Sequence, residues 1–153
     1  MATTSPERKL FKKYKKALIS KLGNKALDNI TIDRICKAEF AAWGGCVPSD
    51  RVVLKPFHYY VVNVDNHDQP GSHWLAVYTS AKRAYIYDSF ARDPASIVFK
   101  LLKTISKKGF KLSKTDLVHN MEQIGYNSEV CGQISMAWLL TVRDLGIEKG
   151  RNI

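Results

Sequence analysis

The hydrophobic positions in the first part of the chain recur at helical spacing. Ser5, Pro6 and Glu7 supply an N-cap, a proline at the first helical position and an early acidic side chain. Apolar residues then follow every three or four positions until Gly23, which is a typical residue at a helix end. The pattern predicts an amphipathic helix that ends at Gly23. A second, short helix is predicted to start at Thr31.

The period of the hydrophobic pattern changes in the middle of the chain. Residues 43–48, Trp-Gly-Gly-Cys-Val-Pro, are rich in turn-forming residues and predict a loop. Three short runs of β-branched and aromatic residues follow, and they predict strands over residues 58–64, 73–79 and 83–88. Alternation along the last two runs places apolar residues on both faces of a sheet. Helices are therefore expected to cover both faces.

Two further helices and one strand complete the predicted fold. Residues 93–94, Asp-Pro, begin a helix whose apolar stripe ends at Gly109, and residues 115–119 predict a fourth strand. A last helix runs from Ser128 to a stop at Gly146, and its broad apolar surface indicates a central position. We therefore expect an α/β (or α+β) fold, in which helices flank a small mixed or antiparallel sheet.

Length and composition are typical of one soluble domain spanning residues 1–153. The chain is 45% hydrophobic and 25% charged. Its three cysteines lack Cys-x-x-Cys spacing and the N-terminus lacks the apolar core of a signal peptide, so an intracellular setting is expected. No apolar run approaches the roughly 18 residues that a membrane span needs, so no membrane association is expected. No set of residues has metal-site spacing, so no metal is expected either.

The net charge of +10 is concentrated in two segments. Residues 1–25 hold eight Lys or Arg against one Glu, and residues 100–114 hold six lysines and no acid. Such patches attract polyanions, including nucleic acid, but they can equally be solvated helix faces, and both interpretations stay open. The candidate nucleic-acid-binding residues are Lys12, Lys13, Lys15, Lys16, Lys107 and Lys108.

The predicted hairpin brings two candidate catalytic side chains together. A two-residue loop at residues 80–81 would pair Thr79 with Lys82, and that register places His73 directly opposite Asp88. Opposed Cβ atoms lie about 4.5–5.5 Å apart, which allows a carboxylate to accept a hydrogen bond from an imidazole and fix its tautomer. The alternative is an incidental surface pair.

Cys131 is predicted to lie in the first turn of the last helix. Unpaired N–H groups and the helix dipole lower the pKa of a thiol in that position. Gly132 beside it leaves room for a substrate to approach. A thiolate with a neighbouring imidazole is an activated nucleophile for acyl transfer. Without His73, however, a cysteine in an apolar helix is better interpreted as a core residue.

Three blocks of the sequence, in this order, resemble the adenovirus-type and SUMO-specific cysteine proteases. They are the His-Trp block at residues 72–78, the acid block at residues 84–90, and the Gln…Cys-Gly block from Gln123 to Gly132. Residues 45–50 also resemble the Gly-Val-x-x-x-Asp loop that precedes the His-Trp block in viral members. The resemblance implies an adenain-like, papain-like protease fold and leaves the N-terminal helix unassigned.

The same resemblance implies a role for each site residue. Cys131 is the expected nucleophile, His73 the general base and acid, and Asp88 the residue that orients His73. Gln123 is expected to donate its side-chain amide to the oxyanion. Gln123 lies eight residues before Cys131, more than is usual in the family, so an extra residue must bulge. Gln133 lies too far into the helix to replace it.

The resemblance also implies the expected activity, which is that of an endopeptidase that cleaves after glycine in Gly-Gly-X or Gly-X-Gly sites. The catalytic core would span residues 40–145, with Trp74 and Gly132 contacting substrate, although Trp74 can equally be a core aromatic. Short length, the viral-type loop and the basic patches favour a virus or virophage maturation protease that processes capsid or core precursors. It would act in the virion or in the cytoplasm or nucleus of the infected cell.

We expect a monomer without a cofactor, with nucleic acid or a peptide as a candidate activator. Three alternatives stay open. The first is a deconjugase of ubiquitin-like modifiers, the second an acetyltransferase that uses the same triad, and the third a non-catalytic, nucleic-acid-binding virion protein on the same fold.

Overall fold

The structure is a computed structural model that describes residues 4–65, 68, 73–90, 98–112, 117–118 and 129–153. In this part of the chain five strands form one sheet in the order β1-β2-β3-β4-β5. Their bounds are Trp43–Pro48 for β1, Tyr59–Asn63 for β2, Trp74–Thr79 for β3, Ala84–Tyr87 for β4 and Leu117–Val118 for β5. The two central pairings are antiparallel, whereas β1 with β2 and β4 with β5 are parallel. The sheet is therefore mixed.

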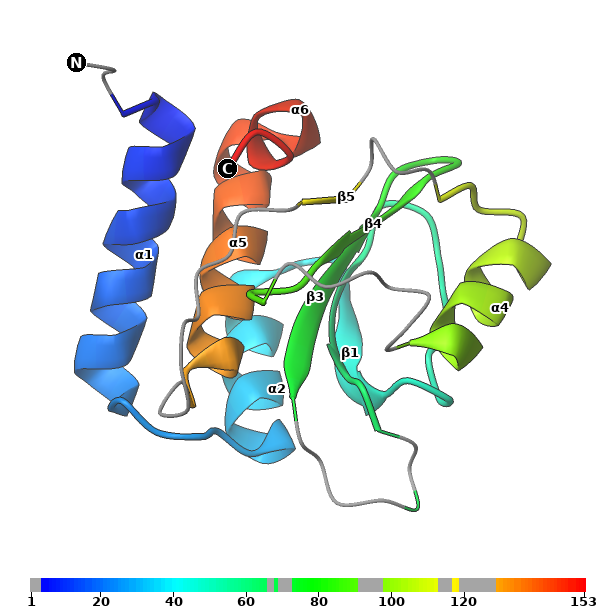
Figure 1. Ribbon diagram of the computed structural model, residues 1–153, viewed down its shortest axis with the longest axis horizontal. Coiled ribbons are helices and arrows are strands. Elements are labelled where there is room, and N and C mark those ends of the chain that lie inside the picture. The colour runs from blue at the N-terminus through cyan, green and yellow to red at the C-terminus, as the bar shows by residue number, and fades with distance from the viewer. Residues whose placement is uncertain (1–3, 66–67, 69–72, 91–97, 113–116, 119–128) are drawn as a thin grey trace.

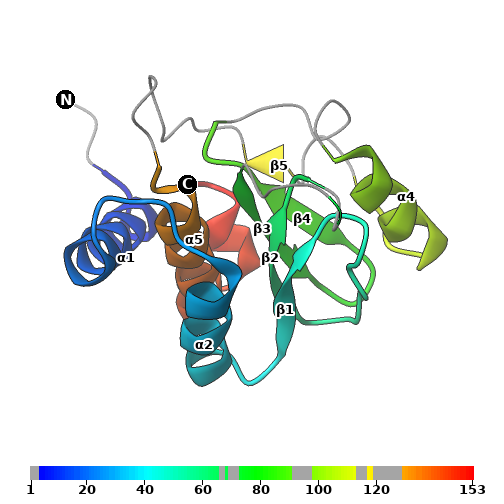
Figure 2. The same ribbon diagram turned by 90° about the horizontal axis from the view of Figure 1, so that it is seen from below.

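Helices cover both faces of this sheet, as the alternating strands predicted (Figures 1 and 2). The helices are α1 (Pro6–Leu22), α2 (Asn29–Glu39), α4 (Phe99–Lys107), α5 (Cys131–Leu145) and α6 (Ile147–Gly150). Helix α5 packs on β3, and α1 and α2 pack against α5, whereas α4 lies on the opposite face. The predicted α/β fold with helices flanking a mixed sheet is confirmed.

The helix ends follow the local signals in the sequence. The Ser5 hydroxyl accepts a hydrogen bond from the Arg8 N–H at the start of α1 (3.2 Å), and Gly23 ends this helix with a φ of 91°. Helix α2 starts two residues before the predicted Thr31, because the Asp28 carboxylate caps the Thr31 N–H (2.7 Å). In the part of the chain described, no helix is both long enough and apolar enough to cross a membrane.

Helix α4 and strand β5 lie where the sequence predicts them, as far as the described residues reach. Helix α4 ends before Gly109, whose φ of 81° suits glycine, as predicted. Its predicted start at residues 93–94 lies outside the described residues. Leu117 and Val118 confirm part of the predicted fourth strand, and the rest of residues 115–119 also lies outside them.

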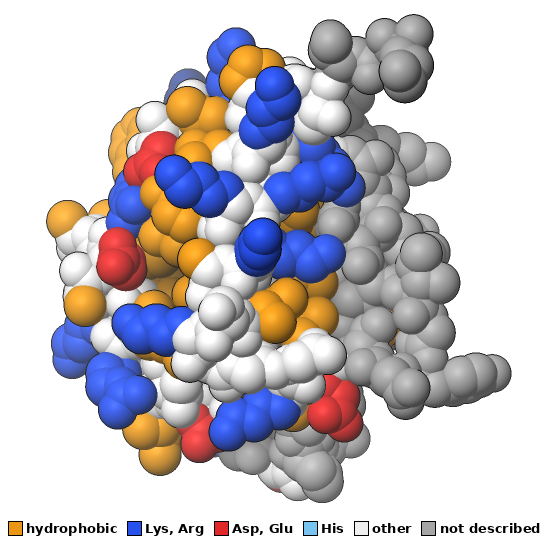
Figure 3. All heavy atoms as spheres, turned by 90° about the vertical axis from the view of Figure 1, so that its left-hand side faces the viewer, with side chains coloured by type: hydrophobic (Ala, Val, Ile, Leu, Met, Phe, Trp, Pro, Cys, Tyr) orange, Lys and Arg blue, Asp and Glu red, His pale blue; other side chains and the backbone are white. Residues whose placement is uncertain are grey.

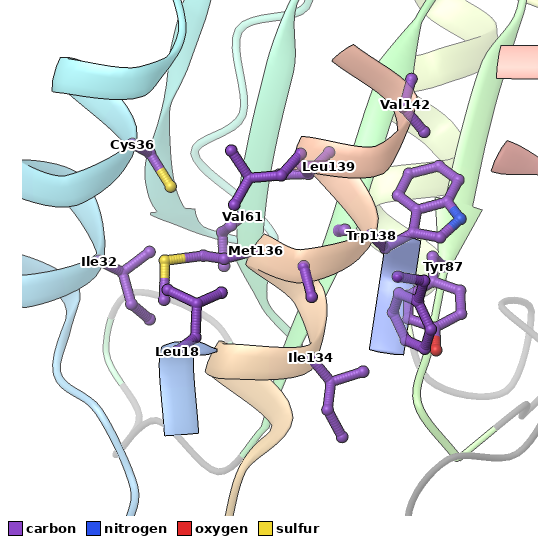
Figure 4. Close-up of a cluster of buried hydrophobic side chains, with 14 of the residues drawn as sticks. Leu18, Ile32, Cys36, Val61, Tyr87, Ile134, Met136, Trp138, Leu139 and Val142 are labelled. Atoms are coloured by element: carbon purple, nitrogen blue, oxygen red, sulfur yellow. The ribbon is translucent and has the colours of Figure 1, made fainter. Parts of the chain in front are cut away.

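Helix α5 is the centre of the larger core, as its broad apolar surface predicted. It begins at Cys131, so this residue lies in the first turn, and every residue from Cys131 to Val142 is buried. Figure 4 shows side chains from α1 and α2 on one side of α5 and Tyr87 of the sheet on the other. Trp138 stacks on Tyr87 with ring centroids 5.3 Å apart and donates to the Gly150 carbonyl (3.1 Å). The nucleophile candidate is therefore carried on a firmly packed element.

Residues 43–48 form the edge strand β1, so the predicted loop is wrong. Gly44 and Gly45 interrupt the regular pairing with β2 without ending it, because the register shifts between Trp43 and Gly45. A Cβ at Gly44 would lie 2.1 Å from the ring of Tyr60. The glycine therefore marks a close approach between neighbouring strands rather than a turn.

The predicted hairpin exists, but its register is wrong by two residues. Thr79 pairs with Ala84 instead of Lys82, which leaves a four-residue connection. The connection is longer because the Lys82 carbonyl accepts from the Lys111 N–H (2.8 Å) and Arg83 forms a bridge to Lys111. An even shift leaves every side chain on its predicted face.

Candidate active site

Three of the predicted site residues lie at one end of the sheet. His73 immediately precedes β3, Asp88 immediately follows β4, and Cys131 is the first residue of α5. The start of β3 and the end of β4 meet at the same end of the sheet because the two strands are antiparallel. Helix α5 packs on β3, and its N-terminus reaches the same place, where the Trp74 N–H donates to the Cys131 Sγ (3.4 Å).

His73 and Asp88 form a buried hydrogen-bonded pair despite the changed register. His73 Nε2 lies 2.6 Å from Asp88 Oδ1, and the two side chains are only 7% and 2% exposed. They contact each other as diagonal rather than directly opposed neighbours, which the shared face and the long imidazole side chain allow. Since Asp88 occupies Nε2, Nδ1 is the ring nitrogen left to exchange a proton with a thiol.

The surroundings of His73 and Cys131 shift both pKa values toward an ion pair. Burial lowers the pKa of His73, but hydrogen bonds with Asp88 and Cys131 outweigh it and raise that pKa above its ordinary value. Burial raises the pKa of the Cys131 thiol, but the hydrogen bond with His73 and the N–H groups of Trp74 and Gly132 lower it overall. The arrangement favours a thiolate beside an imidazolium.

The two other cysteines have the opposite electrostatics. Burial is the main cause that raises the pKa of both Cys36 and Cys46 far above that of an ordinary thiol. Neither has a histidine among the causes of its shift, and negatively charged neighbours raise both pKa values further. Cys131 is therefore distinct in its chemistry, not only in its place in the sequence.

The predicted substrate residues Trp74 and Gly132 lie against each other beside the thiol. A Cβ at Gly132 would lie 3.4 Å from Trp74 Cδ1 and 3.2 Å from Ile32 Cδ1. The Trp74 indole N–H donates to the Leu27 carbonyl (2.9 Å), which fixes the ring against the segment between α1 and α2. Trp74 is half-buried, so it is both a packing residue and partly accessible.

The predicted oxyanion donor, Gln123, lies outside the described residues. Gln133 is not placed to donate to the oxyanion. Its side chain is fully buried, and its amide N–H groups donate to the carbonyls of Gly23 (2.9 Å) and Lys25 (2.8 Å). It thereby fastens the segment between α1 and α2 to the first turn of α5. The contact was not predicted, since nothing in the sequence pairs residue 133 with residues 23 and 25.

The predicted nucleic-acid-binding lysines lie on two separate flanks. Lys12, Lys13 and Lys16 are exposed on α1, and Figure 3 shows Lys and Arg side chains spread over this flank with apolar side chains between them. A shallow depression of about 500 Å³ is lined there by Lys12, Lys15, Lys16, Ile19 and Ser20. Lys107 and Lys108 are exposed at the end of α4, across the molecule (Figure 1).

Neither a metal site among the described residues nor a match to a family model or a curated protein identifies a function for this chain. Among the described residues no group of three or more His, Cys, Asp or Glu side chains could hold a metal ion. No protein-family model matches the chain, and no curated protein is significantly similar to it. The arrangement of Cys131, His73 and Asp88 is therefore the observation from which a function can be argued.

Proposed function

We propose that this protein is a cysteine endopeptidase with an adenain-like, papain-like fold. The observation that supports the proposal is the thiol of Cys131 at the start of a buried helix, beside an imidazole whose other nitrogen is hydrogen-bonded to Asp88. This arrangement has the three parts of a nucleophilic triad: a nucleophile, a base, and a group that orients the base. The order of the resembling sequence blocks supports the same assignment.

The reaction follows from the ion pair. His73 holds the proton released by Cys131, and the thiolate attacks the scissile carbonyl to form a tetrahedral intermediate. The imidazolium then protonates the leaving amine, which leaves a thioester on Cys131. Water deprotonated by His73 hydrolyses this thioester and restores the thiol. The Cys131 N–H lies at a helix N-terminus and is a donor for the oxyanion, and we propose Gln123 as the second donor.

Burial of the catalytic pair supports a preference for glycine before the scissile bond. Cys131 is 8% exposed and His73 is 7% exposed, and Trp74 and Ile32 lie close to Gly132, the residue that follows the nucleophile. A side chain on the substrate residue next to the scissile bond would have to displace these groups, whereas glycine brings none. We therefore propose cleavage after glycine, in Gly-Gly-X or Gly-X-Gly sequences.

The proposed natural substrates are capsid or core precursors of a virus or virophage. The support comes from the short chain, the resemblance of residues 45–50 to the viral loop, and the two basic segments. A basic protease surface would be concentrated on nucleoprotein by electrostatic attraction.

Internally quenched peptides test the proposed activity. We expect turnover of a Gly-Gly-X peptide, little turnover of the matched Ala-Ala-X peptide, and mass-spectrometric cleavage after the glycine. Cys131→Ala should abolish turnover, and His73→Ala should reduce kcat by about 10³-fold or more, because the nucleophile loses its base. Cys46→Ala is the matched control and should retain full activity, since its thiol has a raised pKa.

The same assay separates the alternatives. Cleavage only behind a folded ubiquitin-like modifier would favour a deconjugase, and transfer from an acyl-CoA would favour an acetyltransferase. Absence of all three reactions, together with equal behaviour of wild type and Cys131→Ala, would refute the catalytic proposal.

A non-catalytic, nucleic-acid-binding protein is the second candidate function. The exposed lysines along α1 favour it, because they present several positive charges on one helix flank. This candidate predicts salt-sensitive DNA binding and no labelling of Cys131 by a Gly-Gly peptide vinyl sulfone. Rapid labelling of Cys131 would reject it as the sole function.

A further inference from the structure

The ring of Phe90 lies against the ring of His73. The centroids of the Phe90 and His73 rings are 5.1 Å apart, with an interplanar angle of 45°. Phe90 is half-buried and belongs to the turn that follows β4, two residues beyond Asp88.

The backbone of Phe90 contacts the same pair. Its N–H donates to Asp88 Oδ1 (3.1 Å), which is the oxygen that also faces His73 Nε2 at 2.6 Å. A carboxylate that accepts from the N–H two residues later forms a tight local turn. The turn therefore fixes both the carboxylate and the ring that lies against its partner.

These two contacts have a common physical consequence. An aromatic ring against the imidazole excludes water from one side of the His73–Asp88 hydrogen bond, and that bond is stronger in the resulting low-dielectric surroundings. A ring near a cation also attracts it, so the imidazolium is favoured over the neutral ring. Burial by the ring disfavours the imidazolium, but the strengthened bond to Asp88 and the attraction of the ring oppose that cost, just as hydrogen bonds outweigh burial in the raised pKa of His73. Their net effect supports the form of His73 that stabilises a thiolate at Cys131.

We infer that Phe90 is a positioning residue of the catalytic pair: its N–H fixes the Asp88 carboxylate, and its ring holds and shields the His73 imidazolium. The inference rests on the proposed function, because it assigns Phe90 a part in generating the Cys131 nucleophile. Phe90 acts through His73 and Asp88.

The test is the pH dependence of Cys131 alkylation, followed by mass spectrometry of the Cys131 peptide after iodoacetamide treatment. In Phe90→Ala we expect the midpoint of thiolate formation to rise by about one pH unit, so that alkylation at acidic pH slows about tenfold. With the Gly-Gly-X peptide, kcat should fall while KM changes less than about twofold, since the ring does not act through substrate binding.

Conservative and remote variants separate positioning from folding. Phe90→Tyr keeps the ring and should restore the wild-type profile, whereas Phe90→Leu keeps bulk without the ring and should still raise the midpoint. Phe99→Ala removes a phenylalanine that is 62% exposed on α4 and should leave the profile unchanged. If Phe90→Ala does not fold, as judged by circular dichroism, Phe90→Leu decides the question.

An unchanged alkylation profile in Phe90→Leu, or a Phe90→Tyr variant as impaired as Phe90→Ala, would overturn the inference. Alkylation needs no substrate, so it also distinguishes the two proposals. Suppose that Cys131 of the wild type alkylates at acidic pH, that the Phe90 variants alkylate more slowly, and that the wild type cleaves no peptide. This combination would refute the protease and leave the positioning role intact.

Discussion

The reactivity of Cys131 comes from its neighbours rather than from the cysteine itself. Cys36 and Cys46 carry the same side chain, and burial raises the pKa of both thiols. Cys131 is also buried, but His73 and two backbone N–H groups reverse the effect of burial. Contacts with His73 and with the N–H groups of Trp74 and Gly132 thus distinguish one thiol from the other two.

The pKa shifts predict a pH range for the ion pair. The lowered pKa of Cys131 forms the thiolate at lower pH, and the raised pKa of His73 keeps the imidazolium to higher pH. Both shifts widen the range in which the pair exists, and activity should fall on either side of it. His73→Ala should move thiolate formation upward toward the ordinary cysteine pKa of about 8.5.

Thiolate absorbance in the ultraviolet, measured as a pH titration, checks this prediction. His58→Ala is the matched control, because His58 bonds the Pro56 carbonyl and is not among the causes of the Cys131 shift. A titration that is the same in His73→Ala and wild type would contradict the ion pair. Cys131→Ala identifies the part of the signal that belongs to this thiol.

At the scale of elements, β1 depends on the absence of a side chain at Gly44. Tyr60 on the neighbouring strand is fully buried, and its hydroxyl donates to the Val53 carbonyl (3.0 Å) and accepts from the Lys55 N–H (2.8 Å). The ring cannot move away from position 44 without breaking these bonds. Glycine at position 44 therefore lets the edge strand and the following segment pack around one tyrosine.

Gly44→Ala should destabilise the fold by about 2–4 kcal/mol, because overpacking and the rupture of a buried hydrogen bond act together. Urea denaturation followed by circular dichroism measures the change in the free energy of unfolding. Gly109→Ala is a useful comparison: φ is 81° there but no atom lies within 4 Å of the added Cβ, so only about 1–2 kcal/mol of backbone strain is expected. Equal effects of the two variants would contradict the steric explanation.

The hairpin shows which property of an element the sequence predicts well. The faces of β3 and β4 were predicted correctly, because alternation depends only on the strand's own residues. The register of the hairpin was predicted wrongly, because it depends on the hydrogen bond that the Lys82 carbonyl accepts. The donor is the N–H of Lys111, which lies beyond α4. His73 and Asp88 nevertheless meet, since a shift of two residues preserves the face.

At the scale of the whole molecule, the two basic segments are separated by the body of the fold. Helix α1 and helix α4 lie on opposite flanks, with α5 and the sheet between them (Figures 1 and 2). A charge count along the chain cannot reveal this separation, because it contains no distances. The α1 flank and the α4 flank are therefore two separate candidate surfaces for binding a polyanion.

Neutralising each flank separately tests nucleic-acid binding. On duplex DNA, the slope of log affinity against log salt changes by about 0.9 for each phosphate that the protein no longer neutralises. If α1 binds DNA, replacing Lys12, Lys13, Lys15 and Lys16 with Gln should reduce the slope by about 3–4, and Lys107→Gln with Lys108→Gln should reduce it by at most about 2. Fluorescence anisotropy of labelled DNA, recorded over a series of salt concentrations, measures this slope.

The control removes two exposed lysines elsewhere, Lys37 and Lys55. The change in salt slope per lysine removed is compared between this control and the α1 variant. Equal changes would show that net charge, not the α1 flank, attracts DNA. Absence of any salt-dependent binding by the wild type would remove nucleic acid as a partner.

The sequence by itself determined most of the elements, the two-sided apolar sheet, the central last helix and the candidates Cys131, His73 and Asp88. Caps, glycines and hydrophobic periods are local, so they can be interpreted without knowing the fold. Tertiary structure decided the β1 strand, the hairpin register, the fastening role of Gln133 and the position of Phe90. Each of these depends on a partner distant in sequence or on the path of a turn, and only the folded chain places those groups together.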